Sequence, residues 1–150
     1  MNAILPNRPL QADAHGVRML EFKALGTNCV VKFRLDDEGQ ALRFASDVLE
    51  WIGAFEAKFS RFRPGSMISR INAAAGKDWV EVDSEMEHML RLAGDLHRRT
   101  DGILDATMLP LLRVWDWKTV HRKLPEKAEV KAAVALTGWA RVELRPGAVL

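Results

Sequence analysis

A long amphipathic segment constrains the fold of this chain more than any other feature. Up to about Lys58, apolar side chains recur at intervals of three and four, which places them on one face of an α-helix. Asp36 or Asp37 can cap the start of this helix, because a carboxylate accepts hydrogen bonds from the N–H groups of the first turn. The side chains expected to face inward are Leu42, Ala45, Val48, Leu49, Ile52, Phe55 and Phe59.

The segments that precede this helix alternate between apolar and polar side chains. Residues 18–24 and 29–35 show the period-two pattern of half-buried strands. We expect a turn at residues 26–28 to join them. Two strands followed by a long helix indicate an α+β fold of mixed strands and helices.

The remainder of the chain continues this mixture. Pro64-Gly65 is a strong turn signal, and Ser66 is expected to be the N-cap of a short helix. Asp83 or Ser84 is expected to begin a further helix. The other expected elements are strands at 79–82 and 139–144, helices at 107–117 and 125–136, and a turn at 145–147.

Composition and charge exclude several functional classes. The formal net charge is only +2 over 150 residues. The chain therefore lacks the strong positive charge that is typical of nucleic-acid-binding proteins. The single cysteine, Cys29, can form neither an internal disulfide nor a metal cluster. The histidines are scattered without ligand spacing; they are His15, His88, His97 and His121.

The N-terminal residues, 1–17, are expected to form a flexible segment. They contain no apolar stretch of signal-peptide length. No part of the chain approaches the ~20 apolar residues that a transmembrane helix needs. We therefore expect no membrane span, and the sequence as written indicates a cytoplasmic protein.

Residues 101–117 combine a turn, a carboxylate and a helix start. Asp101-Gly102 is a turn pair, and Asp105 follows two apolar residues, which is an unusual setting for a charge. Thr107 can cap a helix, with Pro110 in its first turn. One interpretation is a loop that leads into a core helix. The other is a ligand site, because N–H groups at a helix start attract phosphate or carbonyl oxygens.

Residues 59–72 place polar and aromatic groups in one loop. Ser60, Arg61, Phe62 and Arg63 offer a hydroxyl, two guanidinium groups and a ring. Such a set suits a planar ligand that carries phosphate, since rings stack and arginine binds phosphate bidentately. The alternative is an ordinary connection between helices with solvated arginines.

Together these segments resemble the FAD:protein FMN transferases, the ApbE-like flavin transferases. The order and spacing of the family pattern hold from about Met19 to Leu144. The matching positions are Leu25-Gly26-Thr27, Ser60-Arg61-Phe62, Ser66, Arg70-Ile71-Asn72, Gly102-Ile103-Leu104-Asp105-Ala106-Thr107, Pro110-Leu111 and Trp115. The resemblance implies the N-terminal part of the ApbE-like, T-fold-like architecture, over residues 18–150.

The resemblance also implies a chemistry. Members bind FAD beside a divalent cation, usually Mg²⁺, cleave the pyrophosphate, and attach FMN to a Thr or Ser of a target protein. The targets are typically subunits of membrane redox complexes, so FAD and a protein acceptor are the implied partners. Many members are exported and lipid-anchored, whereas this sequence shows neither a signal peptide nor a lipidation cysteine near its start.

By the same resemblance, five residues are expected to contact the cofactor. Leu25 stands where the family usually has Met, and Phe62 where it commonly has Tyr. Ile103, Leu104 and Asp105 match a stretch that usually reads Ala or Gly, Phe, Asp. Asp105 keeps the family identity, while the replacements at the other positions keep an apolar contact and alter stacking or hydrogen bonding.

The second half of the family pattern is not found before Leu150. That half holds a Gly-Gly-x-Ala-Lys-Gly segment and the Asp and Thr associated with the metal. No catalytic or metal-binding residue is therefore assigned, the Mg²⁺ site is expected in the missing half, and this chain alone should not transfer FMN. Three readings stay open: part of a flavin transferase, a non-catalytic flavin-binding or self-associating module that forms homo-oligomers, and, least favoured, a helical interaction or nucleic-acid-binding protein.

Overall fold

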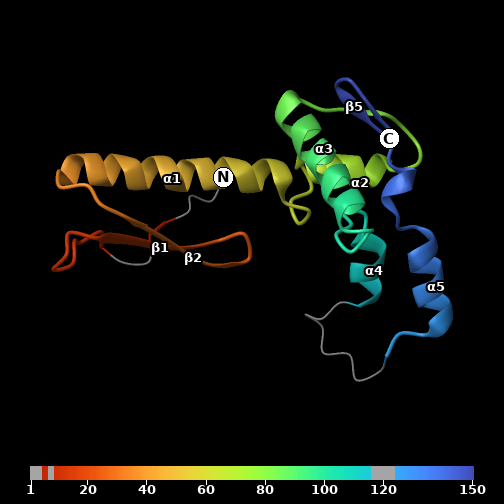
Figure 1. The fold of residues 1–150 in the computed structure, drawn as a ribbon, viewed down its shortest axis with the longest axis horizontal. Helices are drawn as coiled ribbons and strands as arrows, with labels where there is room; N and C mark the ends of the chain where they lie inside the picture. Colours follow the sequence, from red (N-terminus) through yellow and green to blue (C-terminus); the bar gives the residue numbers. More distant parts are fainter. Residues whose placement is uncertain (1–4, 7–8, 116–123) are drawn as a thin grey trace. The chain divides into compact units, whose positions relative to one another are not determined.

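The computed structural model describes residues 5–6, 9–115 and 124–150, and divides the chain into two compact units, Met1–Ala73 and Ala74–Leu150. Each unit is described by itself. The longer elements are labelled in Figure 1. The full order is β1 (Arg18–Ala24), β2 (Thr27–Phe33), α1 (Glu38–Phe59), α2 (Met67–Ala74), β3 (Val80–Glu81), α3 (Ser84–Arg99), α4 (Leu109–Val114), α5 (Lys127–Ala135), the 3₁₀-helix η1 (Trp139–Arg141), β4 (Leu144–Arg145) and β5 (Ala148–Val149). The expected α+β fold is confirmed.

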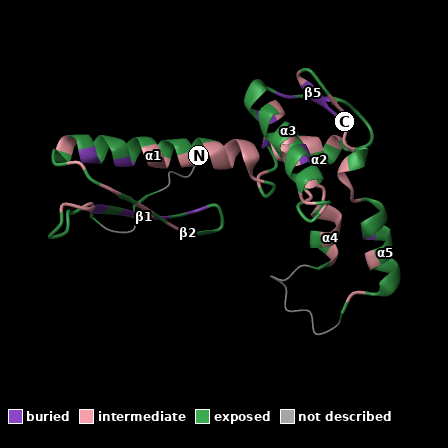
Figure 2. Ribbon diagram, viewed as in Figure 1, coloured by how far each residue is buried: buried purple, intermediate pink, exposed green. Residues whose placement is uncertain are grey.

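The first unit is an antiparallel hairpin covered by one long helix. β1 and β2 pair along their whole length, and α1 runs beside them (Figure 1). Alternate side chains of β1 point into the core, where Leu20 and Phe22 are almost fully buried against Ala45 of α1. Figure 2 shows the buried residues of this unit on β1 and α1. The apolar face of the β1–β2 hairpin thus packs against the apolar face of α1, as the alternation in the strands and the helical spacing predict.

The turn of this hairpin lies one residue earlier than expected. Residues Leu25 and Gly26 form it, with φ values of 54° and 75°, and β2 begins at Thr27. Positive φ at both central residues is the two-residue hairpin geometry that matches strand twist. Asn or Gly usually occupies the first of these positions, so Leu25 gave no signal of its conformation. The expectation of a turn at residues 26–28 was therefore wrong.

The start of α1 follows the expected capping chemistry. The Asp37 carboxylate accepts a hydrogen bond from the Gln40 N–H at 2.7 Å, and the helix then extends to Phe59. Ala41 and Ala45 are its buried residues, while Leu42, expected to face inward, is exposed. A hairpin of only two strands covers a narrower stripe of the helix than the apolar pattern suggests.

Ser66 caps α2 as expected. Its hydroxyl accepts from the Ser69 N–H at 3.0 Å and donates to the Ser60 carbonyl oxygen at 2.6 Å. The side chain is almost completely buried, so both roles of the hydroxyl are satisfied inside the loop. Ser66 therefore ties the end of α1, at Ser60, to the start of α2, at Ser69.

The described residues of the second unit form three helices, one 3₁₀-helix and a small sheet of strand order β3-β5-β4. Asp83 caps α3 by accepting from the Met86 N–H at 2.9 Å, as expected. Residues 139–141 form the 3₁₀-helix η1 instead of the expected strand, and pairing begins only at Leu144. The side chain of Trp139 in this 3₁₀-helix packs its indole directly against Gly94 of α3.

The contact between Gly94 and Trp139 leaves no room for a side chain at residue 94. A Cβ placed there would lie 2.6 Å from the indole Nε1 and 2.9 Å from Cε2. Real carbon atoms do not approach so closely, and the ring is rigid. Gly94 therefore permits α3 and η1 to pack together.

We expect Gly94→Ala to lower the free energy of unfolding by roughly 1–2 kcal/mol. Two effects oppose each other. Alanine favours the helix by about 1 kcal/mol relative to glycine, but the steric clash with the rigid indole ring should cost more than this, near the upper end of the range for overpacked cores. Urea denaturation measures the change. In a Trp139→Ala background the same substitution should be stabilising; a loss of equal size in both backgrounds would show that Trp139 is not the cause.

Glu87 of α3 holds the turn between β4 and β5. Its carboxylate accepts from the Gly147 N–H at 2.9 Å and from Arg91 at 2.6 Å. The bond from Gly147, followed by that from Arg91, lowers the pKa of Glu87 below its ordinary value of 4.5. The stabilisation is therefore present above that value and is lost as the pH falls through the folded-state pKa.

Glu87→Gln should remove this part of the pH dependence. The amide oxygen still accepts from Gly147 but cannot ionise, so the variant's urea midpoint should fall less than that of the wild type from about pH 5 to about pH 3. Glu143→Gln, at an exposed position, is the matched control. Parallel curves for wild type and Glu87→Gln would refute the assignment.

Candidate functional site

The Asp105 carboxylate is held in a fixed orientation by its own loop. Its side chain is only 10% exposed. Oδ1 accepts from the Thr107 N–H at 2.8 Å and from the Thr107 hydroxyl at 2.6 Å. That hydroxyl also accepts from the Gly138 N–H at 2.7 Å, so the loop is fastened to the segment that leads into η1.

Thr107 does not cap a helix, contrary to the sequence-based expectation. α4 begins at Leu109, and Met108 stands at its N-cap without a side-chain hydrogen bond. The Thr107 hydroxyl is already used by Asp105 and Gly138. Pro110 lies in the first turn of α4, as expected. The expected end of this helix, residues 116–117, lies outside the described residues.

His97 of α3 approaches the same carboxylate. Its Nδ1 lies 3.5 Å from Asp105 Oδ2, and the backbone reversal after α3 produces this approach. Asp101 and Gly102 have φ values of 49° and 80°, and the Gly102 N–H donates to the His97 carbonyl oxygen at 2.9 Å. The expected Asp101-Gly102 turn is confirmed.

Sequence reasoning missed His97, because it was judged only by metal-ligand spacing. A usable signal was present. A histidine in the last turn of a helix, followed by an Asp-Gly reversal, is brought back beside the residues that come just after the turn. Asp105 is among those residues, so the pair could have been proposed from the turn chemistry.

Two exposed apolar side chains precede the buried carboxylate. Ile103 is 84% exposed and Leu104 is 51% exposed, and the Leu104 N–H donates to the Thr100 hydroxyl at 3.1 Å. Large apolar groups held outward on a hydrogen-bonded loop are typical of a contact surface. Together with Asp105, this loop can cover an apolar ring system and accept a hydrogen bond at its edge.

The two other expected cofactor contacts belong to the first unit, at the C-terminal end of α1. Leu25 is half-exposed, and its N–H donates to Glu56 Oε1 at 2.6 Å. Phe62 is exposed, with the Arg61 guanidinium carbon 4.1 Å from its ring centroid. The expected residues thus form two groups: Leu25 and Phe62 in one unit, and residues 103–105 in the other.

The backbone of Leu25 is strained at the hairpin turn. A left-handed conformation costs a non-glycine residue roughly 1–2 kcal/mol, and such strain is retained where surrounding contacts enforce it. The hydrogen bond from the Leu25 N–H to Glu56 is such a contact. It orients the turn against α1 while the leucine side chain remains accessible to a ligand.

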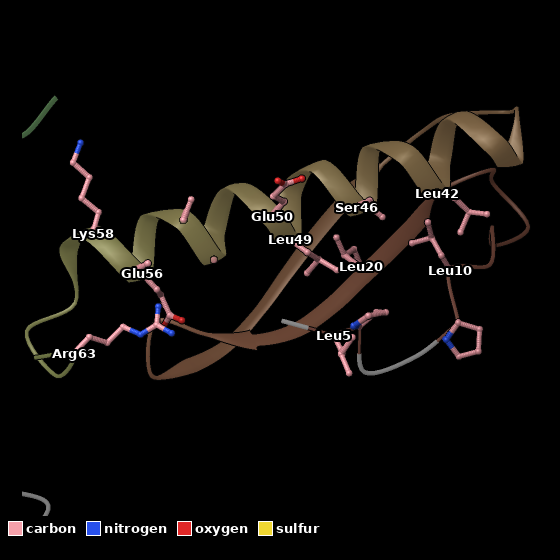
Figure 3. Close-up of a pocket in the computed structure, with 16 residues that line it drawn as sticks. Leu5, Leu10, Leu20, Leu42, Ser46, Leu49, Glu50, Glu56, Lys58 and Arg63 are labelled. Carbon is pink, nitrogen blue, oxygen red and sulfur yellow. The ribbon is translucent and has the colours of Figure 1, made fainter. Parts of the chain in front are cut away.

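A cavity of about 1060 Å³ lies beside α1 in the first unit. Figure 3 shows Glu56, Lys58 and Arg63 toward one end and Leu10 and Leu42 toward the other. None of the expected cofactor contacts lines it. The cavity nevertheless adjoins Leu25 and Phe62, because Glu56, which accepts from the Leu25 N–H, and Arg63, next to Phe62 in sequence, both line it.

Two further findings bear on what the described residues can hold. Among residues 5–6, 9–115 and 124–150, no cluster of three or more His, Cys, Asp or Glu side chains could bind a metal ion. No helix in that part of the chain is both long and apolar enough to span a membrane.

Comparisons with known proteins agree on one family. A family model described as "ApbE family" matches residues 25–149. The FAD:protein FMN transferase of Salmonella typhimurium (strain LT2) is 25% identical over 131 residues, which cover 85% of this chain and 37% of that protein. The resemblance inferred from the motifs is confirmed.

Solved structures show the same similarity. The ApbE protein of Thermotoga maritima matches with a TM-score of 0.80 and 26% identity, covering 89% of this chain and 44% of that one. The flavin transferase ApbE of Vibrio cholerae matches with a TM-score of 0.78 and 20% identity, over the same shares of the two chains. This chain spans less than half the length of these relatives. Because the family match extends over most of its residues, the chain belongs to the ApbE family.

Proposed function

We propose that this chain is the FAD-binding portion of a protein flavinyltransferase, which cleaves FAD and attaches FMN to a Thr or Ser of a target protein. The Asp105 loop carries the proposal. It presents a mostly buried, oriented carboxylate beside two exposed apolar side chains, at positions that match the most specific block of the family pattern. The Salmonella relative is named for this activity.

The chemistry of the loop fits part of FAD. Asp105 Oδ1 already accepts two hydrogen bonds from Thr107, whereas a carboxylate oxygen offers about two acceptor positions. Oδ2 therefore keeps capacity to accept from a hydroxyl or N–H of the cofactor. Ile103 and Leu104 supply apolar contact to a ring. On the first unit, Leu25 and Phe62 supply the same kind of contact.

The metal is proposed to bind elsewhere in the family fold. Phosphoryl transfer depends mainly on positioning and on neutralising the charge of the phosphates, and Mg²⁺ supplies that neutralisation when bound. The described residues contain no cluster suited to it, so their proposed part is to bind and orient FAD. The protein acceptor, such as a redox-complex subunit, would be recognised by the complete fold.

A second candidate is a non-catalytic flavin-binding module that self-associates. One observation favours it: among the described residues, β2 pairs with β1 alone, which leaves the backbone groups of its other edge available to another strand. Size-exclusion chromatography with and without FAD distinguishes a monomer from such an assembly.

Asp105→Asn should weaken FAD binding by roughly 10- to 100-fold, the usual loss for a hydrogen bond to a charged group. The amide can still accept from Thr107, so the fold should be retained, as circular dichroism can verify. Quenching of flavin fluorescence gives the dissociation constant. The matched control is Asp95→Asn, which removes an exposed carboxylate of α3 that pairs with Arg98. Equal affinity of wild type and Asp105→Asn, or no binding by the wild type, would contradict the proposal.

Leu25→Gly should act in opposite directions on stability and affinity. Glycine adopts positive φ without strain, so the free energy of unfolding should rise by about 1 kcal/mol. Loss of the apolar side chain should weaken FAD binding by roughly 3- to 10-fold. Thermal unfolding and the same fluorescence titration measure the two effects. A variant that is more stable but binds FAD as well as the wild type would remove Leu25 from the site.

A further inference from the structure

His97 contains a polar atom that the proposed function does not use. Its Nδ1 is buried without a hydrogen-bond partner, as the only such side-chain atom found in the described part of the chain. The nearest complementary atom is Asp105 Oδ2, at 3.5 Å. The imidazole as a whole is 28% exposed, so the buried atom faces the carboxylate rather than the solvent.

The position of the ring is restricted by its surroundings. Gly102 lies over it, and a Cβ at that residue would approach His97 Cε1 to 3.3 Å. On the same helix face, three residues earlier, Gly94 is in contact with Trp139. The ring is therefore confined between its own helix and the returning loop, with Nδ1 toward Asp105.

We propose that His97 is a positioning residue for Asp105, and that it donates the Nδ1–H to Oδ2. This inference rests on the proposed function, because its purpose is to fix the carboxylate for FAD. With Oδ1 saturated by Thr107 and one acceptor position of Oδ2 directed to His97, a single position on Oδ2 remains for a donor of the cofactor. The separation of 3.5 Å is a few tenths of an ångström longer than a normal N–H···O hydrogen bond, so the proposal requires only a small movement of the imidazole.

The proton required at Nδ1 is present in two of the three forms of the side chain. The Nδ1–H tautomer and the imidazolium both carry it, and only the Nε2–H tautomer lacks it. Of the two neutral tautomers, a carboxylate beside Nδ1 favours the one that carries the proton there. The form that the ring adopts is therefore a direct test, and it needs no flavin.

Nitrogen-15 NMR of the imidazole in the flavin-free chain provides that test. We expect neutral His97 to carry its proton on Nδ1, and Asp105→Asn to shift the population toward the Nε2–H tautomer. The exposed His88 of the same helix serves as an internal reference that should not respond. An unprotonated Nδ1 in the wild type would overturn the proposal.

A pair of variants then separates the hydrogen bond from packing. His97→Asn keeps an N–H donor close to the position of Nδ1, whereas His97→Phe keeps the ring without a donor. We expect FAD affinity within roughly threefold of wild type for His97→Asn and a loss of roughly tenfold for His97→Phe, the value of one hydrogen bond. In an Asp105→Asn background, His97→Phe should reduce FAD affinity by less than about twofold, because the hydrogen-bond acceptor has already been altered.

Equal losses in the Asn and Phe variants, or an undiminished loss in the Asp105→Asn background, would show a packing role and overturn the proposal. If His97→Phe fails to fold, His97→Leu replaces it in the same comparison. His88→Phe controls for a new aromatic side chain on α3. Failure of the wild type to bind FAD would refute the proposed function alone, since the tautomer measurement still decides whether His97 donates to Asp105.

Discussion

The second unit depends on contacts that join α3 both to the loop that follows it, through His97 and Asp105, and to η1, through Gly94 and Trp139. The contacts form a closed circuit through Gly94, His97, Asp105, Thr107, Gly138 and Trp139. The circuit begins at Gly94 and ends at His97, which lie three residues apart on one face of α3. Because each contact limits the freedom of the next, the carboxylate is oriented before any ligand arrives, which reduces the entropy that binding must overcome.

The first unit uses a different constraint to present its side chains. There, a glutamate of α1 holds the hairpin turn through a backbone N–H, and the turn keeps a leucine in a left-handed conformation. Strain of this kind is typical of functional positions. Each unit therefore contains a rigid local arrangement with exposed apolar groups.

Features encoded by neighbouring residues could be predicted from the sequence. The caps at Asp37, Ser66 and Asp83 follow from a side chain and the backbone three residues later, and the family motifs indicated residues 103–105. The role of Thr107 could not be predicted, because its hydroxyl is bound by Gly138, 31 residues away. The packing of Trp139 likewise involves a glycine distant in sequence, Gly94. Local rules fail where a long-range contact competes for the same group.

The most direct test of the central claim, that the Asp105 loop contacts the flavin, is an amide chemical-shift titration of the chain with FAD. We expect the largest shifts at residues 103–107, with further shifts at Leu25 and Phe62 and none centred on the apolar part of the cavity beside α1. Shifts concentrated at cavity residues such as Leu49 and Glu50, with residues 103–107 unaffected, would contradict it.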